Sequence, residues 1–161
     1  MLLPIIATAQ SHESSYRIEL NHYFFDARII DIEPTPNWEG YYLDNKQDAF
    51  VINLTKGIAL KDAFFLGAGL GYQNFEGHHG LAVFGQGEIS PINKRIKPVA
   101  LFRAGYSHLW NQYDKGTGTF MAETSLGFEL NIRGMLLIPG VGVVFMQQSR
   151  LWTLKIAFVF P

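Results

Sequence analysis

The sequence predicts an all-β protein, an eight-stranded antiparallel up-and-down transmembrane β-barrel, and three observations lead to this fold class. Eight segments of about ten residues alternate between apolar side chains and small or polar ones, as tilted membrane-spanning strands do. Glycine dominates the non-apolar face of several of these segments. No run approaches the roughly 18 consecutive apolar residues of a membrane helix. Any membrane crossing must therefore use strands.

The final segment, residues 151–160, shows the alternation most clearly. Large apolar side chains occupy every second position, at Trp152, Leu154, Ile156, Phe158 and Phe160. The other face carries Thr153, Lys155 and Ala157. In a strand with period two, one face therefore meets an apolar environment and the other meets a crowded interior.

Segment 64–74 carries glycine at three successive positions of one face, Gly67, Gly69 and Gly71. Further glycines fall on the same face of other segments, at Gly105, Gly127, Gly140 and Gly142. Glycine suits a face that lines a narrow barrel interior. The alternative fold is a soluble eight-stranded barrel of the lipocalin type with its apolar face inward, and it would expose this glycine face to water.

The other six strands are expected at residues 16–24, 49–60, 81–90, 98–110, 119–130 and 135–146. Lys56 falls on an apolar face, where a bulge or a side chain that reaches the headgroups would accommodate it. Pro139 indicates a bulge or an edge irregularity. An even number of strands places both chain ends on one side of the membrane.

Composition bounds the domain organisation and excludes several classes of function. The 161 residues have room for one domain, and the absence of cysteine removes disulfides, thiolate zinc sites and cysteine nucleophiles. A net charge of −1 gives no sign of a nucleic-acid partner. Residues 1–9 read as the remnant of a secretory signal peptide that ends in Ala7-Thr8-Ala9. Residues 10–161 are then the single barrel domain.

A cluster of charged residues is expected on the inward face: Arg17, Glu19, Glu88, Arg103, Glu123, Glu129 and Lys155. Each charge needs a partner or water there, because an unpaired buried charge costs several kcal/mol. The main interpretation is a lumen charge network that plugs the barrel, and a polar conduit is the alternative. Arg103 is expected to pair with Glu88 or Glu123. Lys155 is expected to pair with Glu129.

The sequence predicts no catalytic residues, no metal site and no cofactor. Ser107 and His108 are adjacent, so they point to opposite faces of a strand and cannot form a hydrogen-bonded dyad. His78 and His79 lack a second pair of ligands at metal spacing. These two histidines could form a transferase site with Asp114 and Ser149 only if the loops brought all four together.

Aromatic and small residues mark the expected contact surfaces. Aromatic belts at headgroup level are expected to include Tyr16, Tyr72, Tyr106, Trp110 and Trp152. The long polar segment 28–48 carries Trp38, Tyr41 and Tyr42, which are expected to form an outer-loop interaction surface. Ala100, Ala104 and Ala122 would let a second barrel approach closely.

The chain resembles the small eight-stranded outer-membrane barrels of the OmpA and OmpX type and, in detail, the short barrel proteins of Bacteroidetes. The motifs that carry the resemblance are Ile52-Asn53-Leu54-Thr55-Lys56-Gly57, Phe65-Leu66-Gly67-Ala68-Gly69-Leu70-Gly71-Tyr72, Arg103-Ala104-Gly105-Tyr106 and Phe158-Val159-Phe160. The resemblance implies an outer-membrane location. The even strand number, together with the signal peptide and the C-terminal barrel strand, places both termini on the periplasmic side. The resemblance also implies that Trp152, Leu154, Ile156, Phe158 and Phe160 form the assembly signal for the barrel-assembly machinery, although Pro161 follows the terminal aromatic residue.

Three functions follow as hypotheses. The leading one is a non-enzymatic structural or accessory subunit of a larger outer-membrane complex. The second is a narrow channel or carrier for small or apolar solutes, and the third is a lipid A-modifying enzyme. The expected partners are outer-membrane lipid and lipopolysaccharide, the assembly machinery and another outer-membrane barrel, with no nucleic acid.

Overall fold

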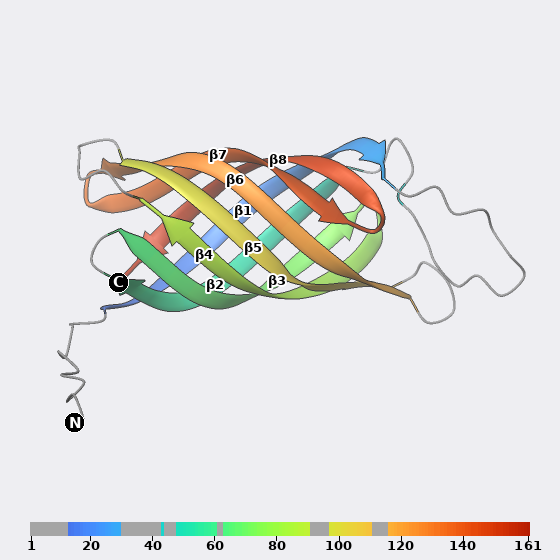
Figure 1. The fold of residues 1–161 in the computed structure, drawn as a ribbon, viewed down its shortest axis with the longest axis horizontal. Helices are drawn as coiled ribbons and strands as arrows, with labels where there is room; N and C mark the ends of the chain where they lie inside the picture. Colours follow the sequence, from blue (N-terminus) through green and yellow to red (C-terminus); the bar gives the residue numbers. More distant parts are fainter. Residues whose placement is uncertain (1–12, 30–42, 44–47, 61–62, 91–96, 111–115) are drawn as a thin grey trace, which may run out of the picture.

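The computed structural model describes residues 13–29, 43, 48–60, 63–90, 97–110 and 116–161, which form a closed antiparallel barrel (Figure 1). Each strand pairs with the next in the chain, and β8 closes the barrel against β1. In the described part of the chain, no helix is long and apolar enough to cross a membrane. The predicted fold class and strand number are confirmed.

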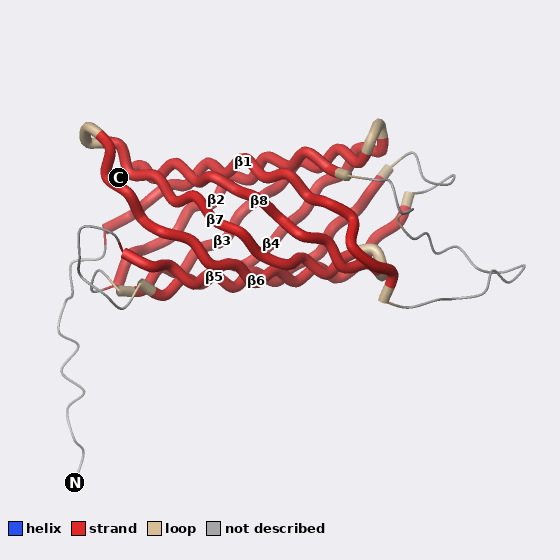
Figure 2. Tube along the Cα trace, turned by 90° about the horizontal axis from the view of Figure 1, so that it is seen from above, coloured by secondary structure: helices blue, strands red, loops and turns tan. Residues whose placement is uncertain are grey.

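The strands are β1 (Glu13–Arg28), β2 (Ala49–Leu60), β3 (Phe64–Phe75), β4 (His78–Ile89), β5 (Lys97–Leu109), β6 (Thr117–Ile132), β7 (Met135–Met146) and β8 (Ser149–Phe160). β1 begins and β8 ends at the same end of the barrel (Figures 1 and 2). We call this the termini end and the opposite one the loop end. β2 and β7 have the predicted bounds, and β1 and β6 are longer than predicted at both ends.

Three hairpins close with two-residue turns, Glu76–Gly77, Arg133–Gly134 and Gln147–Gln148. All six residues have positive φ, between 48° and 99°. Such turns match the twist of the strands that they join. The expected strands 64–74 and 81–90 leave a loop at residues 75–80, and this expectation is wrong, because β3 and β4 continue to the Glu76–Gly77 turn. The Asn74 side chain supports this turn by accepting a hydrogen bond of 2.8 Å from the Gly77 amide.

Side chains alternate between the wall and the lumen along every strand. On the wall, Leu70 is 60% exposed and Leu154 is 52% exposed. On the lumen side, Arg103 and Glu123 are almost completely buried. A soluble barrel would have the reverse arrangement, so the lipocalin alternative is excluded, and the apolar set forms the outer wall as predicted.

The inward glycines of β2 and β3 make room for two phenylalanine rings. A Cβ atom at Gly57 would lie 2.6 Å from the Phe65 ring, and one at Gly67 would lie 2.9 Å from it. At Gly69, a Cβ atom would lie 2.6 Å from the Phe84 ring. These distances are shorter than van der Waals contact, so the rings rest where side chains would otherwise stand. The centre of the lumen is left to longer, charged side chains.

Lys56 and Pro139 do not cause the bulges considered from the sequence. Lys56 pairs in register with Tyr16, and its Nζ lies 5.1 Å from the centroid of the Tyr16 ring, a cation–π arrangement on the wall. Pro139 keeps its partner on β8, while the ladder between β6 and β7 is interrupted beside it, as expected for a residue without an N–H. A register shift occurs instead in β1, between Phe25 and Ala27.

A matched pair of glycines tests the packing of the interior. A Cβ atom at Gly105 would lie 2.1 Å from the carbonyl oxygen of Val83 and 2.7 Å from the Cα of Phe84, and these backbone atoms belong to the neighbouring strand. At Gly85, which faces outward, nothing lies within 4 Å of that position. We expect Gly105→Ala to lower the free energy of unfolding by about 1–3 kcal/mol through overpacking. Gly85→Ala should be neutral or raise it by up to about 1 kcal/mol.

The measurement is denaturant-induced unfolding in detergent micelles, followed by tryptophan fluorescence. Equal losses at Gly105 and Gly85 would contradict a tightly packed lumen and an open outer wall.

Candidate functional site

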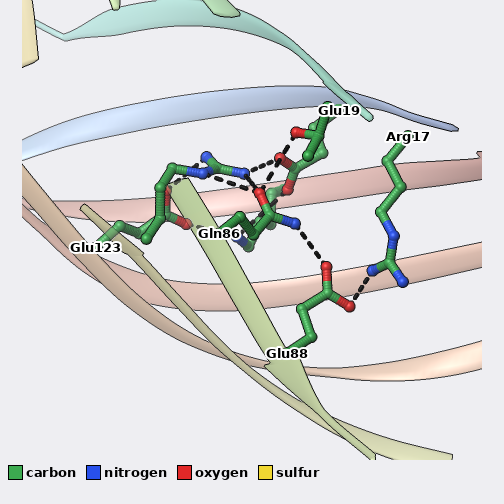
Figure 3. Close-up of polar contacts among 8 residues, drawn as sticks. Arg17, Glu19, Gln86, Glu88 and Glu123 are labelled. Carbon is green, nitrogen blue, oxygen red and sulfur yellow. Dashed lines mark hydrogen bonds and ion pairs between the residues drawn. The ribbon is translucent and has the colours of Figure 1, made fainter. Parts of the chain in front are cut away.

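A network of buried ion pairs lies in the middle of the lumen (Figure 3). The guanidinium of Arg103 pairs with both Glu19 and Glu123 at the centre of this network. Its Nη1 donates to Glu123 Oε2 at 2.8 Å, and its Nη2 donates to Glu19 Oε1. Gln86 Oε1 accepts two further bonds from Arg103, at 3.1 and 2.5 Å. Lys155 Nζ donates to Glu123 Oε1 at 2.5 Å and lies 3.4 Å from Glu19 Oε2. Two carboxylates are thus shared by two cations.

A second pair, Arg17 with Glu88, extends the network toward the termini end. Arg17 Nη1 donates to Glu88 Oε2, and Glu88 Oε1 accepts a bond of 2.6 Å from Gln86 Nε2. Figure 3 shows how Gln86 lies between the two groups. Its oxygen accepts from Arg103 and its nitrogen donates to Glu88. This neutral side chain was not among the predicted site residues, yet it joins the two sets of charges.

Each arginine of the network also stacks on one of the inward phenylalanine rings. The Cζ atom of Arg17 lies 3.7 Å from the centroid of Phe65, and that of Arg103 lies 4.2 Å from the centroid of Phe84. A desolvated guanidinium over an aromatic face gains about 2 kcal/mol. The rings therefore hold the cations on one side while the carboxylates hold them on the other.

All seven charged residues predicted for the lumen lie on inward positions, but only part of the predicted pairing is present. Arg103 pairs with Glu123 as expected. The alternative partner, Glu88, is taken by Arg17. The predicted pair of Lys155 with Glu129 is wrong, because Lys97 Nζ lies 2.9 Å from Glu129 Oε1. β5 begins at Lys97, one residue before the expected strand 98–110. The expected strand boundaries therefore leave Lys97 outside the strands and do not reveal its place beside Glu129.

The loop-end half of the lumen contains a cluster of buried apolar side chains, which we call the apolar plug. Its buried members are Tyr23, Leu43, Ala49, Val51, Phe75, Ala82, Phe84, Leu109, Met121, Val144, Met146 and Leu151, with Phe25 packed against them. Leu43 comes from the long segment between β1 and β2 and is fully buried among these residues. Leu43 therefore contributes to the apolar plug from outside the strands.

The termini end holds a cavity of about 310 Å³, which we call the termini-end cavity. Both the Arg17–Glu88 and the Lys97–Glu129 pairs line it. A second cavity of about 10 Å³, room for about one water molecule, adjoins Glu19, Glu88, Ser125 and Lys155. From one end to the other, the described lumen thus has a cavity, an ionic layer and an apolar plug.

Among the described residues, Ser107 and His108 do not form a catalytic dyad. Ser107 points into the lumen and donates a hydrogen bond of 2.7 Å to Gln73 Oε1. His108 points outward, and its ring lies 5.4 Å from the ring of Trp110. The adjacent pair therefore faces opposite sides, as predicted.

The two adjacent histidines lie at the start of β4 and not in a loop. His79 Nδ1 lies 2.6 Å from the Tyr72 hydroxyl, and His78 Nδ1 lies 3.2 Å from the Phe75 carbonyl oxygen. Ser149 donates to the Gln147 carbonyl oxygen. Within the described ranges, no group of three or more His, Asp or Glu side chains could hold a metal ion.

Several predicted sites lie outside the described residues: the segment 1–9, Trp38, Tyr41, Tyr42 and Asp114. The predicted aromatic belt residues are all outward and 40–56% exposed, at Tyr16, Tyr72, Tyr106, Trp110 and Trp152. Tyr16 lies toward the termini end and the other four toward the loop end, so the aromatic residues form two levels.

No protein-family model matches the sequence, and a comparison with curated proteins finds no match. Among solved structures, Neisserial surface protein A (NspA) aligns at 8% identity, with 93% of this chain and 98% of that chain covered and a TM-score of 0.66. The N-terminal β-barrel domain of Pseudomonas aeruginosa OprF aligns at 13% identity, over 92% of this chain and 99% of that one, with a TM-score of 0.56. The outer membrane enzyme PagL aligns at 13% identity, over 91% and 99%, with a TM-score of 0.47.

These likenesses concern the fold alone. The chain has the architecture of the small eight-stranded outer-membrane barrels. At such low identities, neither the residues of a site nor an activity can be carried over.

Removing the central cation tests the ionic layer. Arg103→Met keeps much of the side-chain length but leaves Glu19 and Glu123 with only Lys155 as a cation. We expect the free energy of unfolding to fall by about 3–5 kcal/mol, because a buried charge loses its partner. In the double variant Arg103→Met with Glu123→Gln, part of this loss should return, since one cation and one carboxylate are removed together.

The matched control is Arg150→Met on the wall, where Arg150 Nε lies 2.5 Å from Asp26 Oδ2 and the arginine side chain is 47% exposed. An exposed pair contributes at most about 1 kcal/mol. If unfolding in detergent shows Arg103→Met to cost no more than Arg150→Met, the ionic layer is hydrated and does not seal the lumen.

Proposed function

We propose that this protein is a non-enzymatic, non-conducting barrel of the outer membrane that serves as a structural or accessory subunit of a larger outer-membrane complex. The observation that carries this proposal is the filled lumen. Ion pairs around Arg103 cross its middle, and the apolar plug follows toward the loop end. A hydrated ion would have to separate paired buried charges and then cross apolar side chains, and both steps cost several kcal/mol.

The location in the outer membrane is supported by the wall. Large apolar side chains are exposed on all eight strands, and a wall of this kind is stable in lipid. The predicted assembly-signal residues lie outward along β8, at Trp152, Leu154, Ile156, Phe158 and Phe160. We propose that the barrel-assembly machinery reads them and that the termini end faces the periplasm.

The proposed partner is another outer-membrane barrel. A row of small residues and a groove on the outer wall support this proposal. A row of small outward residues crosses four neighbouring strands in register, Ala68, Gly85, Ala104 and Ala122. Beside this row, a groove of about 440 Å³ lies over Gly87, between Leu66 and Phe102. Within a membrane, small residues let two protein surfaces pack closely, and such packing drives association.

The two other candidate functions have less support. A channel would require the Arg103 network and the apolar plug to separate together. A lipid A-modifying enzyme would require a nucleophile and a base in contact, and Ser107 and His108 face opposite sides of β5.

Planar-bilayer recordings test the sealed lumen. The purified protein should produce no discrete current steps, because the ionic layer and the apolar plug leave no continuous aqueous path. Protease protection of the same reconstituted sample confirms insertion, and a known porin serves as the positive control. Reproducible steps from inserted protein would contradict the proposal and favour the channel.

Photo-crosslinking in the cells that produce the protein tests the accessory role. p-Azidophenylalanine in place of Phe102, which is 60% exposed at the rim of the groove, should form an adduct with another membrane protein. The same residue in place of Leu20 on β1, which is 37% exposed, is the matched control and should form none. Protein adducts at neither position, or equally at both, would contradict a partner on the β3–β6 side of the wall.

A further inference from the structure

We propose that the termini-end cavity is a binding site for a small zwitterion with a short apolar body, of the kind represented by an aliphatic amino acid. This goes beyond the accessory role, because it requires neither a partner barrel nor a conducting lumen. The volume of about 310 Å³ lies at the lower end of the roughly 300–1,000 Å³ found for small-molecule sites. Such sites combine an apolar lining with a few convergent polar groups, and this cavity has both.

The charges that line the cavity select for a molecule with both signs. Two cations and two carboxylates are present, and each already has a partner, Arg17 with Glu88 and Lys97 with Glu129. A ligand with a single charge would take one member of a pair and leave the other unpaired in a partly desolvated site. A zwitterion replaces one ion pair by two, so every charge keeps a counterpart.

The ligand binds by separating the ion pair between Lys97 and Glu129. They face each other across β5 and β6, with side chains 26% and 18% exposed. Arg17 and Glu88 are only 9% and 6% exposed, and Arg17 is held further by the Phe65 ring. Because a partly exposed pair contributes less than a buried one, the ligand carboxylate binds Lys97 and its ammonium group binds Glu129.

An apolar surface lies directly beyond this pair. Val99 follows Lys97 by two residues on the same face of β5 and lines the cavity together with Val159. Val99 also belongs to a small buried cluster with Ile138 and Ala157, against which Val159 packs. An alkyl chain attached to the bound zwitterion therefore extends from the charged pair onto Val99 and Val159.

The depth of the cavity limits the length of that chain. The Arg17–Glu88 pair closes the inner side, and Gln86 ties Glu88 to the Arg103 network behind it. The next space along the lumen has a volume of only about 10 Å³. The site thus accepts a short aliphatic body and excludes a long one.

The test compares three probes that share one carbon chain: norleucine, hexanoate, which lacks the ammonium group, and pentylammonium, which lacks the carboxylate. Titration calorimetry on the whole barrel in detergent should give saturable binding of norleucine, at least tenfold tighter than binding of either other probe. Methyl NMR signals of Val99 and Val159 should shift on titration. Absence of saturable norleucine binding, or a preference of the wild-type protein for a singly charged probe, overturns the proposal.

Two substitutions should switch the preference rather than merely weaken binding. In Glu129→Gln, Lys97 loses its counterion, so hexanoate should become the best of the three probes. In Lys97→Met, Glu129 loses its counterion, so pentylammonium should become the best. Lys56→Met on the outer wall is the control and should leave the order unchanged. Gel mobility of the folded barrel confirms that each variant folds, and a folded variant whose order of affinities does not switch overturns the proposal.

Discussion

The buried guanidinium of Arg103 is the interaction on which the organisation of the lumen depends. Backbone hydrogen bonds in a barrel join only neighbouring strands. From β5, Arg103 reaches Glu123 on the adjacent β6, Glu19 on β1 and Gln86 on the adjacent β4. The contact with β1 crosses the lumen, as does the Arg17–Glu88 pair between β1 and β4. Side chains therefore connect strands that the sheet itself does not join. Each of the seven charged residues predicted for the lumen has a charged partner.

The position of these cations follows from the glycine pattern of β2 and β3. Residues without a Cβ atom at Gly57, Gly67 and Gly69 let the rings of Phe65 and Phe84 lie against the barrel wall. Those rings become the surfaces on which the two arginines stack. A larger residue at these glycine positions would push a ring toward the axis and occupy the space of a guanidinium. The small residues of β2 and β3 thus determine where charges on other strands can meet.

The sequence predicts the fold and the composition of the lumen well because both depend on local alternation. A period of two decides which face a residue lies on, so Arg17, Glu88 and Lys155 could be assigned to the interior one by one. Contacts across the lumen depend instead on the tilt and stagger of the whole barrel, which no single strand reveals. For this reason the predicted pair of Lys155 with Glu129 is wrong. Lys155 pairs with Glu19 and Glu123 instead.

Other features lacked a local signal altogether. Glu76, Gln147 and Gln148 adopt positive φ in tight turns, although these residue types do not favour that conformation. Leu43 lies in a segment with the composition of a loop and is nevertheless fully buried in the apolar plug. It could not be recognised from periodicity, because an isolated apolar residue in a polar segment has no repeat around it. The packing of Leu43 into the apolar plug is therefore a tertiary property that only the structure makes visible.

Along the barrel axis, the termini-end cavity is followed by the ionic layer and then by the apolar plug. This order allows binding at one end without transport through the lumen. A cavity that ends at paired charges exchanges molecules with one side only, so it can hold a ligand at equilibrium but cannot pass it on. The apolar plug beyond the Arg103 network strengthens this asymmetry, because a charged group that entered it would lose its ion-pair partners among mainly apolar side chains. Under the proposed function, the construction that closes the lumen to transport therefore leaves its termini end suited to bind a small molecule, while the outer wall stays available for contact with lipid or another barrel.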